Sequence, residues 1–218
     1  MTKRDADRSG TTGPSLGRRA VLGGAVAAGA ALVMPRRAFA SASPLAPVQR
    51  RVLDVAKEQM DRAGEALWRR DIAGIADFGV HSSTPRFHFA NVEQGTVRSF
   101  LVAHGTGSDP EHDGFLNDFS NVPGSNATSR GAYVTYEWYT GRYGTSIRLG
   151  GLDPDNSNAL PRYIVAHPAE YATQAHVDRW GRLGRSNGCF AMDPADFNEA
   201  LWHLSGGRLL YADRLGIS

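Results

Sequence analysis

The chain has 218 residues, of which 41% are hydrophobic and 9% are aromatic. This composition argues against a disordered chain and suits one folded domain with a single core. The formal net charge of +2 is misleading, because seven of the 24 Lys and Arg residues but only two of the 22 Asp and Glu residues precede Ser41. From Ser41 onward the chain carries 17 basic and 20 acidic residues, a balance of −3 that does not suit a nucleic-acid-binding surface.

Residues 1–40 have the pattern of an export signal. A basic stretch ending in Arg18-Arg19 precedes an Ala- and Gly-rich apolar run over 20–34, and Ala38-Phe39-Ala40 forms a small-residue cleavage site. The paired arginines are typical of the twin-arginine export route. The apolar run is shorter than the roughly 20 residues that span a bilayer. We therefore expect the mature protein to begin at Ser41 in the periplasm or cell wall without a stable membrane span; an uncleaved anchor is the alternative.

The next predicted element is a helix. After a linker that contains Pro47, residues 48–70 place apolar side chains at mostly three- and four-residue steps: Val52, Val55, Ala56, Met60, Ala63 and Leu67. A proline is well tolerated in the first turn of a helix. We assign residues 41–71 to this linker and N-terminal helix.

Beyond Asp71 the pattern changes to short apolar or alternating runs broken by Gly, Asn, Asp and Pro. These runs predict strands at 72–80, 86–92, 96–103, 132–139, 145–149, 163–166 and 189–192. The polar segment 105–130 predicts a long irregular loop, which is often part of a binding site. Asp193 and Pro194 then begin a late helix that ends at Gly206, and 208–212 gives a last strand. The expected fold class over 72–218 is a β-rich α+β domain with one N-terminal and one late helix.

Cys189 is the only cysteine, so no intramolecular disulfide can form. A lone cysteine in an exported protein is either buried and inert or a working nucleophile. Cys189 directly follows Gly188 where a polar loop meets a strand, and Arg182 and Arg185 supply positive charge that would lower the pKa of the thiol. The N–H groups of Gly188 and Cys189 are candidates for an oxyanion hole.

His167 is the candidate base. It ends the apolar run Arg162 to Ala166, in which strand alternation would place Tyr163, Val165 and His167 on one face. A histidine held at a strand terminus can meet a thiol from the adjacent strand, and a main-chain carbonyl can orient its second ring nitrogen. The alternative is that His167 merely ends a strand beside a buried cysteine.

The run Ser186-Asn187-Gly188-Cys189, with a histidine ending an apolar strand about twenty residues upstream, resembles the active-site signature of murein L,D-transpeptidases. Further motifs that fit this family, over roughly Phe100 to Ala212, are Val102-Ala103-His104-Gly105, Phe119-Ser120-Asn121, Ser129-Arg130-Gly131-Ala132-Tyr133, Arg148-Leu149-Gly150-Gly151-Leu152 and Gly184-Arg185-Ser186. The ordered set is far more specific than any one motif.

The resemblance implies an L,D-transpeptidase-like mixed β-sheet or sandwich domain, with Cys189 as nucleophile, His167 as base and the Pro168 carbonyl orienting that base. We expect the oxyanion and substrate-binding part of the site to comprise Gly188, Asn187, Ser186, Arg185 and His104, the last because it ends a strand as His167 does. Neither a cofactor nor a metal is implied. Two departures concern the grip on the substrate: many relatives have histidine where Asn187 stands and arginine where Ala191 stands.

By the same resemblance, Cys189 would attack the carbonyl preceding a terminal D-amino acid on a peptidoglycan stem peptide and form a thioester. Transfer to an amine gives a cross-link, and transfer to water makes the protein an L,D-carboxypeptidase. A papain-like or related cysteine peptidase or amidase would place the cysteine before the histidine, and here only His203 follows Cys189. A non-catalytic wall-binding module is the third class.

Two other signals have simpler explanations. His104, His112 and the acidic run Asp109 to Asp113 suggest a zinc or calcium site, but Ser120 stands where a calcium loop requires glutamate, which favours a solvated loop. The aromatic residues between Tyr133 and Tyr143 could stack on sugar, but in an alternating strand they favour packing.

Overall fold

The computed structural model describes residues 45–217, which belong to one compact unit. The predicted export signal and its cleavage site lie outside the described residues. Within 45–217, no helix has both the length and the apolar character that a bilayer span requires.

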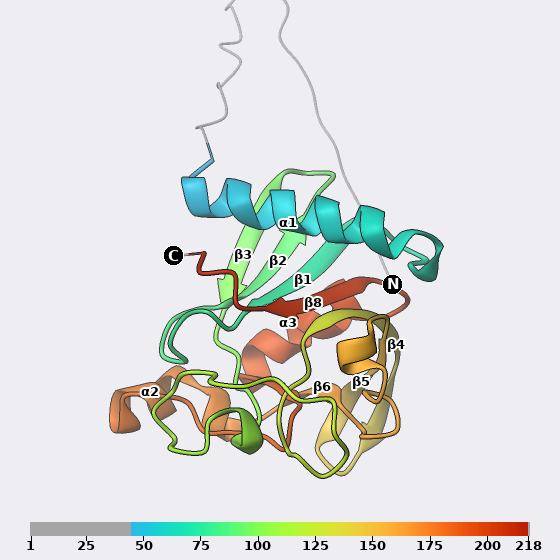
Figure 1. Cartoon of the computed structure of the whole chain (residues 1–218). Coiled ribbons are helices and arrows are strands. Elements are labelled where there is room, and N and C mark those ends of the chain that lie inside the picture. The colour runs from blue at the N-terminus through green and yellow to red at the C-terminus, as the bar shows by residue number, and fades with distance from the viewer. Residues whose placement is uncertain (1–44, 218) are drawn as a thin grey trace, which may run out of the picture. The chain divides into compact units, whose positions relative to one another are not determined.

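Eight strands form one mixed sheet in the order β3-β2-β1-β8-β4-β5-β6-β7 (Figure 1). The pairs β1/β8 and β6/β7 are parallel and all other neighbours are antiparallel. This sheet confirms the predicted β-rich fold class. The strands are β1 Ile72–Asp77, β2 Phe87–Asn91, β3 Thr96–Phe100, β4 Gly131–Gly141, β5 Gly144–Gly151, β6 Val165–Pro168, β7 Phe190–Met192 and β8 Leu209–Asp213.

Helices cover both faces of the sheet. Helix α1 (Pro47–Ala63) begins at the expected proline and buries the stripe Val52, Leu53, Val55, Ala56 and Met60 against residues of β1, β2, β4 and β8. Helix α3 (Pro194–Leu204) packs Phe197, Ala200 and Leu204 into the cluster on the opposite face (Figure 1). Because both faces are covered, β1 is buried along its whole length and its sequence shows no polar alternation.

Helix α2 (Gln174–Trp180) was not predicted from the sequence. Its seven residues are too few to show a helix period, but it carries two terminal signals. The Thr173 side chain accepts a hydrogen bond from the His176 N–H, and Gly181 ends the helix at a φ of 72°. The prediction of two helices was therefore incomplete, whereas the segment 105–130 is irregular apart from one 3-10 turn, as expected.

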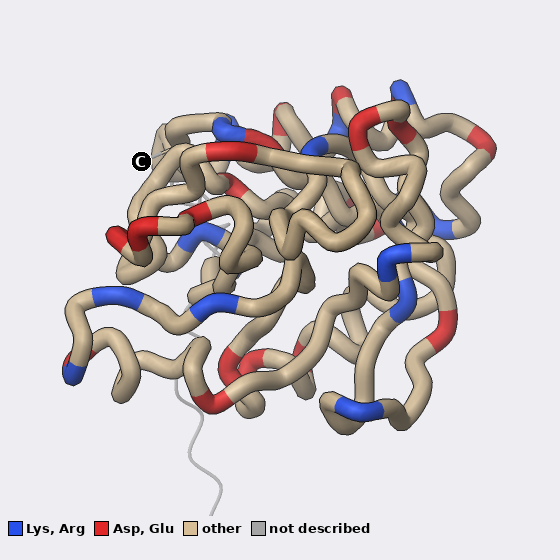
Figure 2. The backbone as a smooth tube through the Cα atoms, turned by 60° about the horizontal axis from the view of Figure 1, so that its bottom comes forward, with Lys and Arg blue, Asp and Glu red and all other residues tan. Residues whose placement is uncertain are grey.

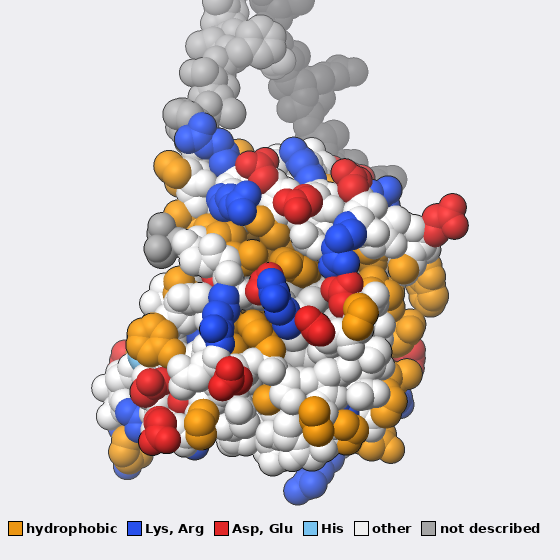
Figure 3. Space-filling model, in the orientation of Figure 1, with side chains coloured by type: hydrophobic (Ala, Val, Ile, Leu, Met, Phe, Trp, Pro, Cys, Tyr) orange, Lys and Arg blue, Asp and Glu red, His pale blue; other side chains and the backbone are white. Residues whose placement is uncertain are grey.

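Charged residues of both signs are interspersed. Figure 2 shows Lys and Arg positions alternating with Asp and Glu along the backbone, and Figure 3 shows the same mixture on the face that it presents. Such mixing is typical of a solvated protein surface.

Asp77, at the end of β1, holds the last described residues of the chain. Its buried carboxylate accepts hydrogen bonds from the N–H groups of Gly79 at 2.9 Å, Leu215 at 2.8 Å, Gly216 at 3.0 Å and Ile217. Hydrogen bonds to a charged group stabilise more than neutral ones, so the C-terminal segment depends on this one side chain.

Replacing Asp77 by Asn should lower the free energy of unfolding by about 2 to 4 kcal/mol, because an amide offers one acceptor oxygen and leaves buried donors unpaired. Urea denaturation measures the change. The control is Asp54→Asn on the exposed face of α1, for which a change of less than about 0.5 kcal/mol is expected. Equal stability of the two variants would contradict the role assigned to Asp77.

Candidate active site

Cys189 and His167 line one pocket. In the parallel pair β6/β7, His167 lies opposite Ala191. Cys189 lies in the bend that directly precedes β7, which begins at Phe190. The pocket has a volume of about 250 Å³ and is lined by Cys189, His167, Arg142, Tyr143, Tyr171, Arg185, Ser186 and Asn187. The structure thus brings together five of the residues that the sequence analysis singled out.

The orientation and tautomer of His167 are fixed by its own neighbour. Nδ1 lies 2.9 Å from the Pro168 carbonyl oxygen. A carbonyl only accepts, so Nδ1 carries the proton and donates, and Nε2 keeps its lone pair. Burial lowers the pKa of His167 below its ordinary value, so the ring is neutral at pH 7. A neutral imidazole with an available nitrogen can accept a proton.

Tyr143 covers one face of His167. The two rings are stacked with centroids 4.7 Å apart and an interplanar angle of 22°. Tyr143 and Arg142 form the tip of the β4–β5 hairpin, whose last pair is Gly141 opposite Gly144. The glycines mark a tight hairpin in the sequence, but no local pattern indicates that its tip reaches the histidine, so these two residues were missed as site residues.

The Cys189 thiol is protonated at rest. The residue is only 6% exposed, and burial raises the pKa of its thiol. The main-chain N–H of Val165 and the Arg162 guanidinium lower that pKa, but burial outweighs both. The sulfur lies 3.7 Å from the Tyr163 carbonyl oxygen, to which the S–H donates. Cys189 and His167 thus line one pocket with both side chains in their neutral forms.

The charges near the sulfur differ from the expected ones. Arg185, predicted to activate the thiol, instead donates to the carbonyl oxygens of Asp109 and Pro110. Arg162 is the arginine that acts on the thiol pKa, and the sequence analysis did not single it out.

Tyr163 was wrongly placed in the strand. It lies in a turn at a φ of 55°, its side chain is 78% exposed, and β6 begins only at Val165. A tyrosine in the left-handed region is uncommon. The turn directs the Tyr163 carbonyl toward the sulfur, which is a functional reason for an unusual backbone conformation.

The loop before Cys189 is held by Ser186. Its Oγ donates to the Cys189 carbonyl at 2.7 Å and accepts from the Gly188 N–H at 3.1 Å. The Gly188 N–H, predicted to serve an oxyanion, therefore already has a partner, whereas the Cys189 N–H makes no hydrogen bond within residues 45–217. Gly188 itself is required, because its φ is 109° and a Cβ would lie 2.7 Å from the Ala127 carbonyl oxygen.

His104 does not line the pocket as expected; it lies buried behind the Ser186 loop. Arg86, itself fully buried, donates to His104 Nδ1 at 2.7 Å, so Nε2 carries the proton and donates to Asp109 Oδ2 at 3.2 Å. Burial and the Arg86 charge lower the pKa of His104 to about 3. The His104 carbonyl accepts from the Ser186 N–H at 2.8 Å, so this network supports the loop that carries the cysteine.

The acidic run near His112 is engaged in its own loop. The Asp109 carboxylate accepts from the N–H groups of Asp113 and Gly114 as well as from His104, and His112 Nε2 lies 3.1 Å from the Leu183 carbonyl. Across residues 45–217, no three His, Cys, Asp or Glu side chains are grouped so that they could hold a metal ion.

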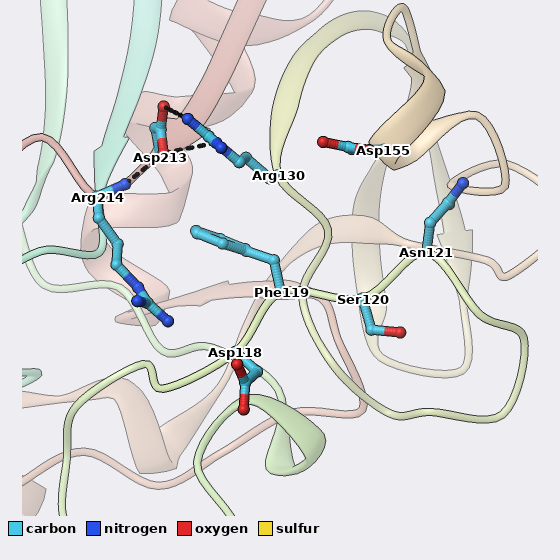
Figure 4. A pocket seen from close by; sticks show the side chains of 8 residues that line it. All are labelled: Asp118, Phe119, Ser120, Asn121, Arg130, Asp155, Asp213 and Arg214. Atoms are coloured by element: carbon cyan, nitrogen blue, oxygen red, sulfur yellow. Dashed lines mark hydrogen bonds and ion pairs between the residues drawn. The ribbon is translucent and has the colours of Figure 1, made fainter.

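A larger hollow of about 540 Å³ lies elsewhere on the surface (Figure 4). It contains the ion pair between Arg130 and Asp213, and the Arg214 guanidinium lies 5.8 Å from the centre of the Phe119 ring. No cysteine or histidine lines it, so it pairs neither a thiol nor its Ser120 hydroxyl with an imidazole base.

His104 should make the protein sensitive to acid. Its folded pKa of about 3 lies below the ordinary 6.5, so the unfolded chain binds the proton first as the pH falls. The contribution of His104 to the free energy of unfolding should be fully present above pH 6.5 and be lost as the pH falls from 6.5 to about 3. In His104→Gln the amide can retain both hydrogen bonds without titrating, so urea denaturation should show a weaker dependence on pH. An unchanged slope would contradict this assignment.

Comparison with known proteins identifies the family. A model of the family described as the L,D-transpeptidase catalytic domain matches residues 46–212. Similar solved structures include an L,D-transpeptidase from Mycobacterium smegmatis, which is 15% identical with a TM-score of 0.40 over 66% of this chain and 58% of that one. Another is the helical cell shape determining protein Pgp2 from Campylobacter jejuni, which is 12% identical with a TM-score of 0.43 over 72% of this chain and 55% of that one.

This chain spans somewhat more than half the length of those solved structures. A search of curated proteins found no match. Because the family model covers most of the sequence, including the Cys189 and His167 strands, the chain belongs to the L,D-transpeptidase catalytic domain family.

Proposed function

We propose that this protein is a peptidoglycan L,D-transpeptidase in which Cys189 is the nucleophile and His167 is the general base. The observation that carries the proposal is the shared pocket: His167 lines it from β6, Cys189 lines it from the bend directly before the adjacent strand β7, and His167 is held as the tautomer whose free Nε2 can accept a proton.

The reaction begins when His167 Nε2 takes the proton of the Cys189 thiol as the sulfur attacks the carbonyl that precedes a terminal D-amino acid. The Cys189 N–H donates to the oxygen that becomes negative. Collapse of the tetrahedral intermediate forms a thioester and expels the D-amino acid, whose amine takes the proton back from the imidazole. An acceptor amine then attacks the thioester, loses a proton to Nε2 and restores the thiol.

The pocket fits an anionic substrate. Arg142 and Arg185 line it, and no Asp or Glu does. The Arg142 guanidinium lies 5.7 Å from the centre of the Tyr143 ring, and that ring stacks on His167. A stem peptide that ends in a free carboxylate one residue beyond the bond to be broken would place its charge near these arginines. Many relatives have an arginine at the position of Ala191, which is buried in β7 here and carries no charge. We propose that Arg142 binds the substrate carboxylate in its place.

Three alternatives to transfer onto an amine remain to be weighed. With water as acceptor, the thioester is hydrolysed and the protein acts as an L,D-carboxypeptidase. A peptidase that pairs the cysteine with a later histidine is disfavoured, because His203 lies on α3 near Glu199 and Phe89 and does not line the pocket. A non-catalytic wall-binding module would not need a base fixed beside the thiol.

The location of the substrate requires export. We propose that residues 1–40 are a twin-arginine signal removed before Ser41 and that residues 41–71 precede a catalytic segment over 72–218. Helix α1 shares a hydrophobic cluster with the sheet, so the mature chain from the helix onward should behave as one folded unit.

Purified protein incubated with a muropeptide bearing a tetrapeptide stem should release D-alanine and yield either a cross-linked or a shortened product, as measured by mass spectrometry. Cys189→Ala should abolish release, and His167→Gln should reduce kcat by about a hundredfold or more, because proton transfer loses its base. Turnover by Cys189→Ala, or an intact muropeptide with wild-type protein across several stem peptides, would contradict the proposal.

Replacing Arg142 by Ala should raise KM by roughly tenfold, because one charge-assisted contact to the substrate carboxylate is lost, while kcat changes little. The effect should disappear with a substrate whose terminal carboxylate is an amide. Arg179→Ala, an exposed arginine on α2 outside the pocket, is the matched control. An equal loss on both substrates would contradict carboxylate recognition by Arg142.

A further inference from the structure

Arg162 organises a loop segment with one side chain. Its Nη1 donates to the Ser120 carbonyl oxygen and to Ser129 Oγ, each at 2.7 Å. Its Nη2 donates to the Ala127 carbonyl oxygen at 2.6 Å and to Ser125 Oγ at 3.1 Å. One half-buried guanidinium therefore holds the segment 120–129 along its whole length.

The tethered segment borders the backbone beside the nucleophile. The Ala127 carbonyl oxygen is 2.7 Å from the point that a Gly188 Cβ would occupy, so it touches the turn leading into Cys189. The next residue, Thr128, accepts through Oγ1 from the Gly105 N–H at 2.9 Å, and Gly105 in turn packs against Gly188. Movement of Ala127 would remove the contact between its carbonyl oxygen and Gly188, the residue before Cys189.

The positive charge of Arg162 has no carboxylate partner. Its four acceptors are two carbonyl and two hydroxyl oxygens, all of them neutral, and it makes no ion pair with residues 45–217. The same guanidinium lowers the pKa of the Cys189 thiol against the effect of burial. A fixed, uncompensated cation beside a buried sulfur stabilises the negative charge that forms there.

We propose that Arg162 is a positioning residue of the acyl-transfer site, which fixes segment 120–129 against Gly188 and provides the positive charge that stabilises the Cys189 thiolate as His167 takes the proton. The inference rests on the proposed function for the reaction that Cys189 carries out, whereas the effect of Arg162 on the thiol pKa can be measured without any substrate. Its two parts, the tether and the charge, respond differently to substitution.

The charge is tested without a substrate. Cys189 is the only cysteine in the chain, so the rate at which the full chain is alkylated by iodoacetamide, measured across a pH series, reports the thiolate of this one group. Arg162→Gln should move the titration midpoint upward by about one unit, because a positive charge near the sulfur is removed. The matched control is Arg98→Gln, which neutralises an exposed arginine on β3 that pairs with Glu199 and should leave the midpoint unchanged.

The tether is tested with Arg162→Lys. Lysine keeps the charge but cannot make the forked contacts to both carbonyl oxygens, so the midpoint should shift by less than about half a unit while kcat/KM for the muropeptide falls about tenfold. If Arg162→Gln does not fold, Arg162→Lys still tests the positioning role. A kcat/KM equal to that of the wild type in Arg162→Lys would overturn it.

An unchanged midpoint in folded Arg162→Gln would overturn the charge assignment, as would an equal shift in Arg98→Gln. If wild-type protein fails to process any muropeptide while the midpoint shifts as expected, the placement of the charge is supported and the proposed function is the part that fails.

Discussion

The candidate site depends on the hydrogen bond that His167 Nδ1 donates to the Pro168 carbonyl. The acceptor belongs to the next residue along β6, so the bond survives only while this short strand keeps its conformation between β5 and β7. It settles which nitrogen carries the proton and directs the other away from the main chain. Stacking of Tyr143 on the ring then limits the remaining rotation. A base fixed in this way need not reorganise when the thiol releases its proton.

Burial governs the electrostatics of the pair. It raises the thiol pKa of Cys189 and lowers the imidazole pKa of His167, so both partners rest in their neutral forms instead of as an ion pair. The Val165 N–H and the Arg162 guanidinium lower the thiol pKa, so they are the groups that would stabilise negative charge on the sulfur in the proposed reaction. A neutral thiol is less exposed to oxidation, which acts on thiolates, than the thiolate of an ion pair would be.

A second layer of buried polar residues supports this arrangement. Arg86, His104 and Asp109 are joined by a series of hydrogen bonds. Arg86 fixes the tautomer of His104, because a guanidinium only donates and His104 Nδ1 must therefore accept. The His104 carbonyl accepts from the N–H of Ser186, and Ser186 Oγ bonds to both Gly188 and Cys189. The turn that carries Cys189 is thus supported by His104 through Ser186 and by the Ala127 carbonyl, which Arg162 holds.

Much of the fold follows from local patterns, because alternation and helix period are local properties: all the predicted strands and both long helices are present, with shifts at their ends. Helix α2 was missed because it is too short to show a period. Tyr163 was misplaced because an apolar residue before a strand looks like part of it. That Cys189 and His167 lie near each other was expected from spacing and motif, and both line one pocket. The burial of His104 and the positions of Tyr143 and Arg162 depend on tertiary contacts between residues far apart in the chain, which local patterns do not reveal.

The tautomer of His167 is the most direct measure of the central claim. Heteronuclear NMR of protein with isotope-labelled imidazole nitrogens, with the His167 signals assigned by comparison with His167→Gln, reports the protonation of each ring nitrogen. At pH 7 the account predicts a neutral ring with the proton on Nδ1. A proton on Nε2, or an imidazolium at that pH, would contradict it, because neither form leaves Nε2 able to accept the proton of Cys189.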